Sequence, residues 1–411
     1  MDGKAMIYEG DNMMGIKRTN RSAALRLLHE RGSMSRKRLA ESTRLTPAAI
    51  TKIVGEMIAE GLVCEGSPVP SSGVGRREVT VELNSRARCA LGVLINLRQA
   101  ILSAVWLDGA VIFSEEIALE PHCDAEQTVR RLSARLMELA AENKLRNELI
   151  IGLGIAIRGI TSPDGRVMRN SFGALDVKNF PICARFEELT GLPCVMSNNV
   201  RALFAAQMFK SRDDDLTSQF FLRCEYGIGA SLSINGHIWR GSSEQCAEIG
   251  HIPVIKRGGK PCSCGKSGCL ETIASPTAIL SGALALLSPE RTPVLWNICK
   301  GRSADEITIE DVFDAAQNGD QEVAQLVDNA IAALASALKS VIYTLDPGKL
   351  VLYGRMFENP YYLTKLMAEM REGVDSGHNI PIEKSRYNQT LENSAAGLLM
   401  VESFFEAGGI V

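Results

Sequence analysis

Glu248-Ile249-Gly250-His251 is followed ten residues later by Pro261-Cys262-Ser263-Cys264-Gly265-Lys266-Ser267-Gly268-Cys269-Leu270-Glu271. One neutral imidazole and three thiolates are the donors of a closed, four-coordinate zinc site. The glycines of this stretch let the backbone turn tightly around one ion. We interpret His251, Cys262, Cys264 and Cys269 as the ligands of a structural Zn²⁺ ion. The alternative is a group of reduced cysteines beside an unrelated histidine, but four potential ligands in one glycine-rich segment favour the metal site.

The same residues carry a resemblance to a known family. Glu248-x-Gly-His251, followed by Cys-x-Cys-Gly-x-x-Gly-Cys-Leu-Glu271, resembles the signature of the ROK family. That family joins bacterial sugar kinases to sugar-responsive repressors of the NagC and Mlc type, and the similarity extends over nearly the whole chain. It implies an α/β fold with an N-terminal winged helix-turn-helix and a two-lobed, actin-like sugar-kinase body. It also implies that Glu248, His251 and Glu271 contact sugar hydroxyls, although His251 and Glu271 could persist for the zinc loop alone.

Length and composition describe an ordinary soluble protein of two or three domains. The chain has 411 residues, 45% of them hydrophobic and 23% charged, which is typical of globular proteins. The sequence shows neither an apolar run near 20 residues nor a signal peptide, so we expect no membrane insertion. Eleven cysteines without a leader favour a reducing compartment and metal ligation over disulfides. We expect the cytoplasm, with association to the nucleoid when DNA is bound.

The charge of the chain is unevenly distributed. Residues 1–80 contain 13 Lys and Arg against 9 Asp and Glu, a net charge of +4 that leaves −7 for the remainder. A basic head on an acidic body is what contact with nucleic acid through one small domain requires. With the local patterns and the family resemblance, it leads us to expect three regions: a flexible arm at 1–18, a winged helix-turn-helix at 19–84, and the body at 85–411 with the zinc loop at 251–269.

Helical spacing predicts three helices in the head, over 20–31, 36–42 and 46–60. A helix of two turns, a turn of three residues and a third helix are typical of a helix-turn-helix. The first turns of the third helix offer small, hydroxylic or cationic side chains to base edges and phosphates in a major groove. An ordinary three-helix module is the alternative. The predicted DNA-contacting residues of this helix are Thr46, Ala48, Ala49, Thr51 and Lys52.

A Ser-, Pro- and Gly-rich segment over 66–77 lies between two strand-like runs, 62–65 and 78–83. This order predicts a long wing that ends with Arg76 and Arg77. Guanidinium groups on such a loop can reach phosphates or a narrow minor groove. The alternative is a solvated linker between domains.

The body alternates strands with helices, which indicates an α/β fold. In the family, the first hairpin holds a phosphate loop of the type Asp-x-Gly-Gly-Thr. The aligned run here is Gly92-Val93-Leu94-Ile95-Asn96-Leu97-Arg98, whose bulky side chains would block a triphosphate. Part of a second glycine loop remains at 226–231, whereas 351–356 lacks the glycines of an adenosine motif.

The resemblance also implies a sugar-side role for three asparagines. Asn170 matches an Asn that contacts a sugar hydroxyl, with simple turn chemistry as the alternative. Asn198 and Asn199 stand where the kinases have Asn-Asp, and that Asp is their general base. An amide can hydrogen-bond a hydroxyl but cannot take its proton near neutral pH. The sequence therefore predicts that sugar binding survives while catalysis is lost.

The leading hypothesis is a DNA-binding transcriptional regulator, a repressor of carbohydrate metabolism genes. A sugar or phosphosugar in a former kinase cleft would control its operator binding. We expect a homodimer or tetramer, because one winged helix reads only a half-site. One alternative is an active ATP-dependent sugar kinase with a DNA-binding head. Another is a repressor controlled by a sugar-transport protein.

Overall fold

The computed structural model describes residues 13–68, 79–120, 123–171, 175, 177–211, 218–372, 380–385 and 388–410. The chain forms two compact units, and it passes from the first unit into the second and back again. The first consists of Met1–Asp213 with Thr390–Val411, and the second of Asp214–Gln389. The predicted head therefore shares a unit with one α/β lobe and with the C-terminal segment.

The head begins with helix α1 (Met13–Arg31), which starts seven residues before the predicted helix. Residues 13–18 of the expected arm are thus helical, because no proline or capping residue stops the helix there. Ser35 caps α2 (Arg36–Thr43) by accepting the Arg38 N–H at 3.3 Å. Thr46 caps α3 (Pro47–Ala59) through the Ala49 N–H at 3.2 Å, with Pro47 at the first helical position. Three residues separate α2 from α3, as predicted.

A small antiparallel sheet completes the described head. Its strands lie in the order β1-β3-β2, with bounds Met34–Ser35, Val79–Leu83 and Val63–Pro68. Val81 pairs with Met34 on one side and with Glu65 on the other. Three helices followed by a β-hairpin are the arrangement of a winged helix. The segment 69–78, with Arg76 and Arg77, lies outside the described residues.

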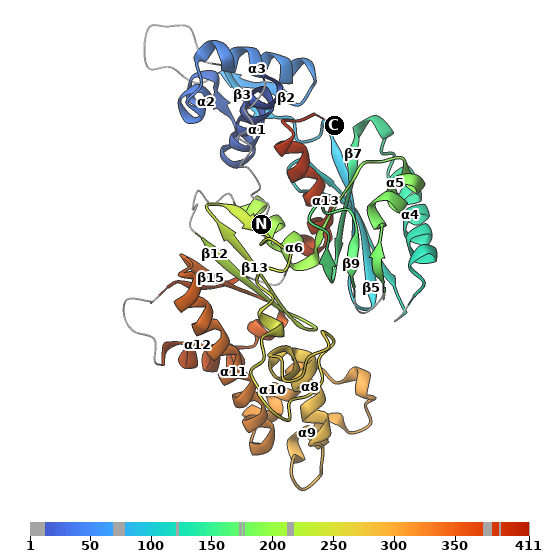
Figure 1. Ribbon diagram of the computed structural model, residues 1–411, viewed down its shortest axis with the longest axis vertical. Helices are drawn as coiled ribbons and strands as arrows, with labels where there is room; N and C mark the ends of the chain where they lie inside the picture. The colour runs from blue at the N-terminus through green and yellow to red at the C-terminus, as the bar shows by residue number, and fades with distance from the viewer. Residues whose placement is uncertain are drawn as a thin grey trace, which may run out of the picture. The chain divides into compact units, whose positions relative to one another are not determined.

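The first lobe is built on a five-stranded sheet in the order β11-β7-β4-β5-β6 (Figure 1). Strands β11, β7 and β4 are parallel, and β5 and β6 form antiparallel hairpins. The strands span Cys89–Ile95 (β4), Gln99–Trp106 (β5), Val111–Ala118 (β6), Ile150–Ile157 (β7) and Cys194–Asn198 (β11). Every residue of β4 and β7 is buried, as in a sheet covered on both faces. These strands belong to the α/β fold that the alternating pattern predicted.

Helices cover both faces of this sheet. Helices α4 (Ala125–Glu142) and α5 (Ile182–Thr190) pack on one face, and α6 (Asn199–Ser211) and α13 (Gln389–Glu406) pack on the other (Figure 1). Three short strands, β8 (Ile160–Thr161), β9 (Met168–Asn170) and β10 (Lys178–Phe180), form a separate sheet.

Helix α13 approaches the sheet at backbone distance. A side chain at Gly92 of β4 would collide with the backbone nitrogen of Gly397, and one at Gly154 of β7 would collide with the carbonyl oxygen of Ala396. Glycine is therefore required at both positions by packing.

The second unit contains another five-stranded sheet, in the order β14-β13-β12-β15-β16. Its strands are Gln219–Cys224 (β12), Ile228–Ile234 (β13), His237–Trp239 (β14), Lys349–Tyr353 (β15) and Ile382–Ser385 (β16). The accompanying helices are Glu271–Ala274 (α7), Pro276–Ala285 (α8), Pro293–Cys299 (α9), Ile309–Gln317 (α10), Gln321–Leu345 (α11) and Pro360–Arg371 (α12). Among the described residues, α11 alone is long and apolar enough to cross a membrane. Its apolar face forms part of the core, through Val323, Val327, Ile331, Leu334 and Leu338.

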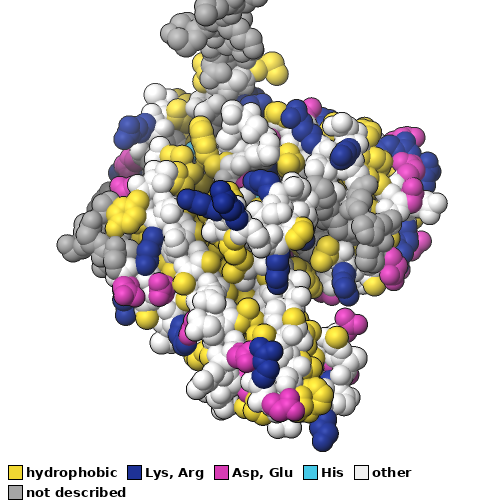
Figure 2. Space-filling model, turned by 60° about the horizontal axis from the view of Figure 1, so that its bottom comes forward, with side chains coloured by type: hydrophobic (Ala, Val, Ile, Leu, Met, Phe, Trp, Pro, Cys, Tyr) yellow, Lys and Arg dark blue, Asp and Glu magenta, His cyan; other side chains and the backbone are white. Residues whose placement is uncertain are grey.

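The surface carries charges of both signs. On the face shown in Figure 2, Lys and Arg side chains alternate with Asp and Glu side chains, and small apolar areas lie between them. Such mixing is typical of a solvated surface.

Candidate functional site

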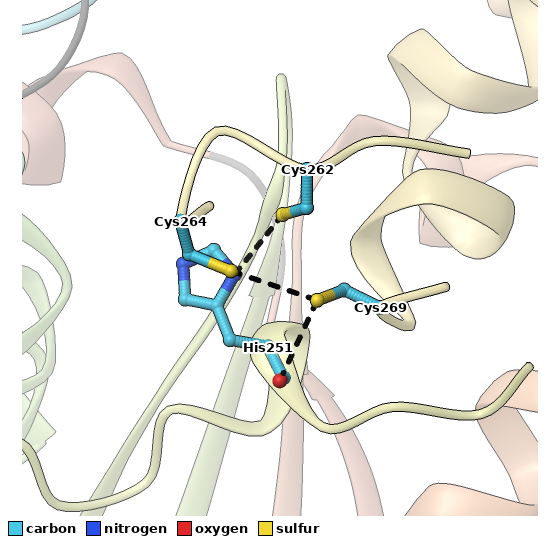
Figure 3. Close-up of side chains that lie close together, drawn as sticks. All are labelled: His251, Cys262, Cys264 and Cys269. Atoms are coloured by element: carbon cyan, nitrogen blue, oxygen red, sulfur yellow. Dashed lines mark hydrogen bonds between the residues drawn. The ribbon is translucent and has the colours of Figure 1, made fainter. Parts of the chain in front are cut away.

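The structure brings the four predicted metal donors together in the second unit (Figure 3). His251 ends a short 3₁₀ turn, Ile249–His251, and Cys269 lies just before α7. Their donor atoms, with those of Cys262 and Cys264, all lie within 4.8 Å of one another. The Cys262 Sγ lies 3.5 Å from the His251 Nδ1, and the Cys264 Sγ lies 3.6 Å from the Cys269 Sγ.

Tight backbone turns produce this cluster. The Cys262 N–H donates to the Lys266 carbonyl at 2.8 Å, and the Gly265 N–H returns to the Cys262 carbonyl at 3.0 Å. Gly265 adopts φ 86° and Gly268 φ 76°, which disfavour other residues. A side chain at Gly268 would also meet the carbonyl oxygen of Ile255.

The thiols of the cluster differ in how readily they ionise. Burial, together with Cys264 and Cys262, raises the pKa of Cys269 to about 12. Burial opposes ionisation of Cys264 as well, but the Lys266 N–H and the neighbouring thiols lower the pKa of Cys264 below its usual range. Tetrahedral Zn²⁺ with Zn–S near 2.3 Å places its donors about 3.4–3.8 Å apart. The two measured separations fit this geometry, so the cluster could hold a metal ion.

Two predicted sugar-site carboxylates frame the metal loop. Glu248 immediately precedes the 3₁₀ turn, and Glu271 begins α7. The Glu271 Oε2 accepts the Ile228 N–H of β13 at 3.0 Å. A side chain at Gly250 would collide with the Ile228 carbonyl. The start of β13 thus fixes the backbone on both sides of His251.

The predicted asparagines gather in the first unit, at the carboxyl edge of the parallel strands. Asn198 ends β11 in register with Ile157 of β7, and Asn170 pairs with Ile160. The Asn198 Nδ2 donates to the Gly159 carbonyl at 3.0 Å, and its Oδ1 accepts the Val200 N–H at 2.8 Å. Both ends of this amide therefore shape the turn into α6, a role that sequence reasoning did not assign.

The next residue faces a partner that the sequence prediction omitted. The Asn199 Nδ2 donates to the Asn96 Oδ1 at 3.4 Å, and Asn199 is buried. Asn96 directly follows β4, within the run aligned to the family's phosphate loop. The sequence did contain a signal for this partner, because Asn96 places an amide within the run aligned to the family's phosphate loop, which has no amide side chain. The residues predicted to contact sugar thus fall in both units, with Asn170, Asn198 and Asn199 in the first and Glu248, His251 and Glu271 in the second.

The predicted DNA-contacting residues of α3 lie on its exposed side. Thr46, Ala48, Thr51 and Lys52 are exposed and Ala49 is half-buried, because Ile50, Ile53, Val54 and Met57 point into the head. The Thr51 hydroxyl donates to the Pro47 carbonyl at 2.7 Å and retains its acceptor lone pairs. Lys37 and Arg38 of α2 are also exposed cations, and the sequence prediction left them out.

Residues 104–399 match the model of the ROK family. The chain belongs to the ROK family. It is similar to the DNA-binding transcriptional dual regulator NagC of Escherichia coli, with 29% identity over 353 residues, 84% of this chain and 82% of NagC. It is also similar to a glucokinase of Halalkalibacterium halodurans, with 31% identity over 216 residues, 53% of this chain and 64% of the glucokinase.

A crystal structure of a ROK family transcriptional regulator, a homologue of the Escherichia coli MLC protein, shares the fold of this chain. The TM-score is 0.78 at 24% identity, and the match covers 96% of this chain and 98% of the other. This ROK member therefore has the two-lobed α/β body with an N-terminal helical head, as its sequence predicted.

Proposed function

We propose that this ROK protein is a DNA-binding transcriptional repressor of carbohydrate metabolism genes, with operator binding controlled by a sugar or phosphosugar. The observation that carries the proposal is the contact between Asn199 and Asn96, on a chain whose head consists of three helices and a small antiparallel sheet. The similarity to NagC over most of both chains supports the same function.

The amide pair supports binding without phosphoryl transfer. An amide at position 199 hydrogen-bonds a hydroxyl but cannot act as the general base. Donation from the Asn199 Nδ2 to Asn96 leaves the Asn199 Oδ1 as an acceptor for a sugar hydroxyl. Gly92, the first residue of the degenerate phosphate-loop run, is packed against α13. The chain therefore keeps a hydroxyl acceptor while lacking the base and the phosphate loop.

In this proposal, the sugar-contacting residues of the first unit are Asn170, Asn198 and Asn199, and those of the second unit are Glu248, His251 and Glu271. Carboxylates and amides suit the hydroxyls of a sugar, which both donate and accept hydrogen bonds. A structural Zn²⁺ held by His251, Cys262, Cys264 and Cys269 would stabilise the loop between Glu248 and Glu271.

DNA recognition is assigned to α3 and the wing. The exposed face of α3 bears Thr46, Ala48, Thr51 and Lys52, with Ala49 at its margin. Arg76 and Arg77 would contact the DNA backbone or minor groove from the wing. A homodimer or tetramer would place two heads on a palindromic operator.

One screen tests this function. Zinc-loaded protein is heated with N-acetylglucosamine, N-acetylglucosamine 6-phosphate, glucose, glucose 6-phosphate, xylose or ATP-Mg. A ligand at 100 times its Kd adds roughly 2.7 kcal/mol of stability. Operator duplexes are selected in parallel from random DNA, and their affinity is measured with each stabilising sugar.

The outcomes separate three functions. Stabilisation by one sugar class, with a changed operator affinity, supports the sugar-controlled repressor. Stabilisation by ATP-Mg together with sugar-dependent ADP release would instead identify a kinase. The similarity to a glucokinase is the reason to test this activity. Operator binding that no sugar alters would point to control by a sugar-transport protein.

A further inference from the structure

Helix α6 connects a predicted sugar-site residue with the DNA-binding head inside the first unit. It begins at Asn199, whose amide faces Asn96, and its last turns contain Phe209. The helix has 13 residues, and at 1.5 Å per residue such a helix is about 20 Å long. A single helix therefore reaches from the contact between Asn199 and Asn96 to the contact between Phe209 and α1.

The C-terminal end of α6 is fixed to α1 by His29. The His29 Nε2 lies 2.9 Å from the Phe209 carbonyl oxygen, and the imidazole stacks on the Phe209 ring at 3.9 Å between centroids. Phe405 of α13 meets the same imidazole edge-on at 5.9 Å. His29 is buried, so these contacts leave it little freedom to move independently of α6.

Helix α6 itself has little room to deform. Most of its residues are buried, including Val200, Leu203 and Phe204. The Lys210 Nζ donates to the buried Ser394 Oγ of α13 at 2.8 Å. Because close-packed interiors shift between discrete arrangements rather than deform continuously, a displacement of the first turn must move the whole helix.

Helix α1 continues the connection to the recognition helix. Arg21 is 1% exposed, and its NH1 donates to the Glu60 Oε1 at 2.9 Å, directly after α3. Its Nε donates to the carbonyl oxygen of Gly408, two residues after the end of α13, at 2.7 Å. A tilt of α1 caused at His29 would therefore reach the end of α3 through Arg21.

We infer that α6 transmits the state of the Asn199 amide to the DNA-binding head, with His29 as the residue that receives it. The inference rests on the proposed function, because it names how sugar binding regulates operator binding. A sugar hydroxyl that engages Asn199 changes its bond to Asn96, and the resulting shift of α6 moves the Phe209 carbonyl against His29. Such coupling requires the ligand to prefer one position of α6 over the other.

Hydrogen exchange on the full-length, zinc-loaded chain tests this inference without knowledge of the sugar. Asn199→Leu replaces the amide with an apolar side chain of similar shape. Asn96→Ala removes the hydrogen-bond partner of Asn199 and adds no bulk. His29→Phe retains the stacking ring but deletes the contact of Nε2. Each amide-pair variant is measured alone and combined with His29→Phe. We expect each to raise exchange of residues 26–31 at least about threefold, and to raise it less than about 1.5-fold in the His29→Phe background.

His237→Phe is the matched control, since His237 is an exposed histidine on β14. This substitution should leave the response of residues 26–31 to both amide-pair variants intact. If both amide-pair variants leave that segment unchanged, or act equally with and without His29, the inference is overturned. Failure to select any operator DNA would remove the proposed function, whereas the exchange data would still decide the role of α6.

Discussion

The Arg21 Nε donates to the Gly408 carbonyl oxygen at 2.7 Å, although 387 positions separate the two residues. The same guanidinium pairs with Glu60 and lies 3.5 Å from the Glu56 Oε2. A buried charge costs several kcal/mol unless it is paired and hydrogen-bonded. This arginine therefore joins the end of α3 in the head to the C-terminal segment of the chain.

Replacing Arg21 should destabilise the first unit. Arg21→Leu leaves the Gly408 carbonyl without this donor, and we expect the free energy of unfolding to fall by about 2–3 kcal/mol. Arg26→Leu is the matched control, because Arg26 is part-exposed and pairs only loosely with Glu402 and Glu406. That change should cost less than about 1 kcal/mol. Urea denaturation measures both, and equal losses would contradict the central role of Arg21.

Removing the metal should unfold the loop between Glu248 and Glu271. Chelation, or Cys262→Ser, should lower the free energy of unfolding by about 3 kcal/mol, a fall of about 6–12 °C in the melting midpoint. Elemental analysis should find one zinc per chain. Cys123→Ser, outside the cluster, should change neither value. A chain without metal that melts at the same temperature would exclude a structural ion.

Restoring the carboxylate should not restore catalysis. Asn199→Asp supplies a general base beside Asn96, but the run from Gly92 to Arg98 still offers no phosphate loop. We expect no sugar-dependent ADP release above the wild-type background. The assay couples ADP formation to NADH oxidation across the sugar panel. Measurable turnover by this variant would show that the chain binds ATP productively.

Gly55 is an exposed glycine within α3 that no internal contact explains. A side chain there would meet nothing within 4 Å, and glycine in a helix costs about 1 kcal/mol relative to alanine. Gly55→Ala should therefore raise stability by up to about 1 kcal/mol and weaken operator binding, if DNA approaches this face. Calorimetry and fluorescence anisotropy measure the two effects. Unchanged operator affinity would exclude the Gly55 face from the interface.

The wing arginines should contribute to DNA affinity through charge. Arg76→Ala with Arg77→Ala should weaken operator binding and reduce the salt slope by roughly 1.8, if both groups neutralise phosphates. The control pair is Lys144→Ala with Arg146→Ala, two exposed cations of the first lobe. An identical slope for the two pairs of substitutions would leave the wing without a role in binding.

Local patterns predicted much of the fold. The second and third helices were predictable because the capping that starts them, by Ser35 and Thr46, depends on neighbours three residues away. The alternation of strands with helices predicted the α/β fold of the body. The metal donors were readable because His251 and the three cysteines lie within one loop.

Contacts between distant segments were not predictable in this way. Two such contacts join Asn96 with Asn199 and Arg21 with Gly408. Each depends on the tertiary fold, so neither produces a periodic pattern in the sequence. Gly92 opens the run aligned with the family's phosphate loop, and packing against Gly397 is sufficient to require glycine there. The role of Asn198 in shaping the turn was hidden for the same reason.

The order of synthesis gives the packing of α13 a further consequence. Strands β4 and β7 leave the ribosome early, but the helix that covers Gly92 and Gly154 is made only after residues 214–389. At 5–20 residues per second, translation of residues 214–389 takes about 9–35 s. During that interval the nascent first lobe has one apolar sheet face without its closing helix. A chain that ends before residue 390 would leave the part of that face that α13 covers exposed, and it would be an expected target of chaperones and proteases.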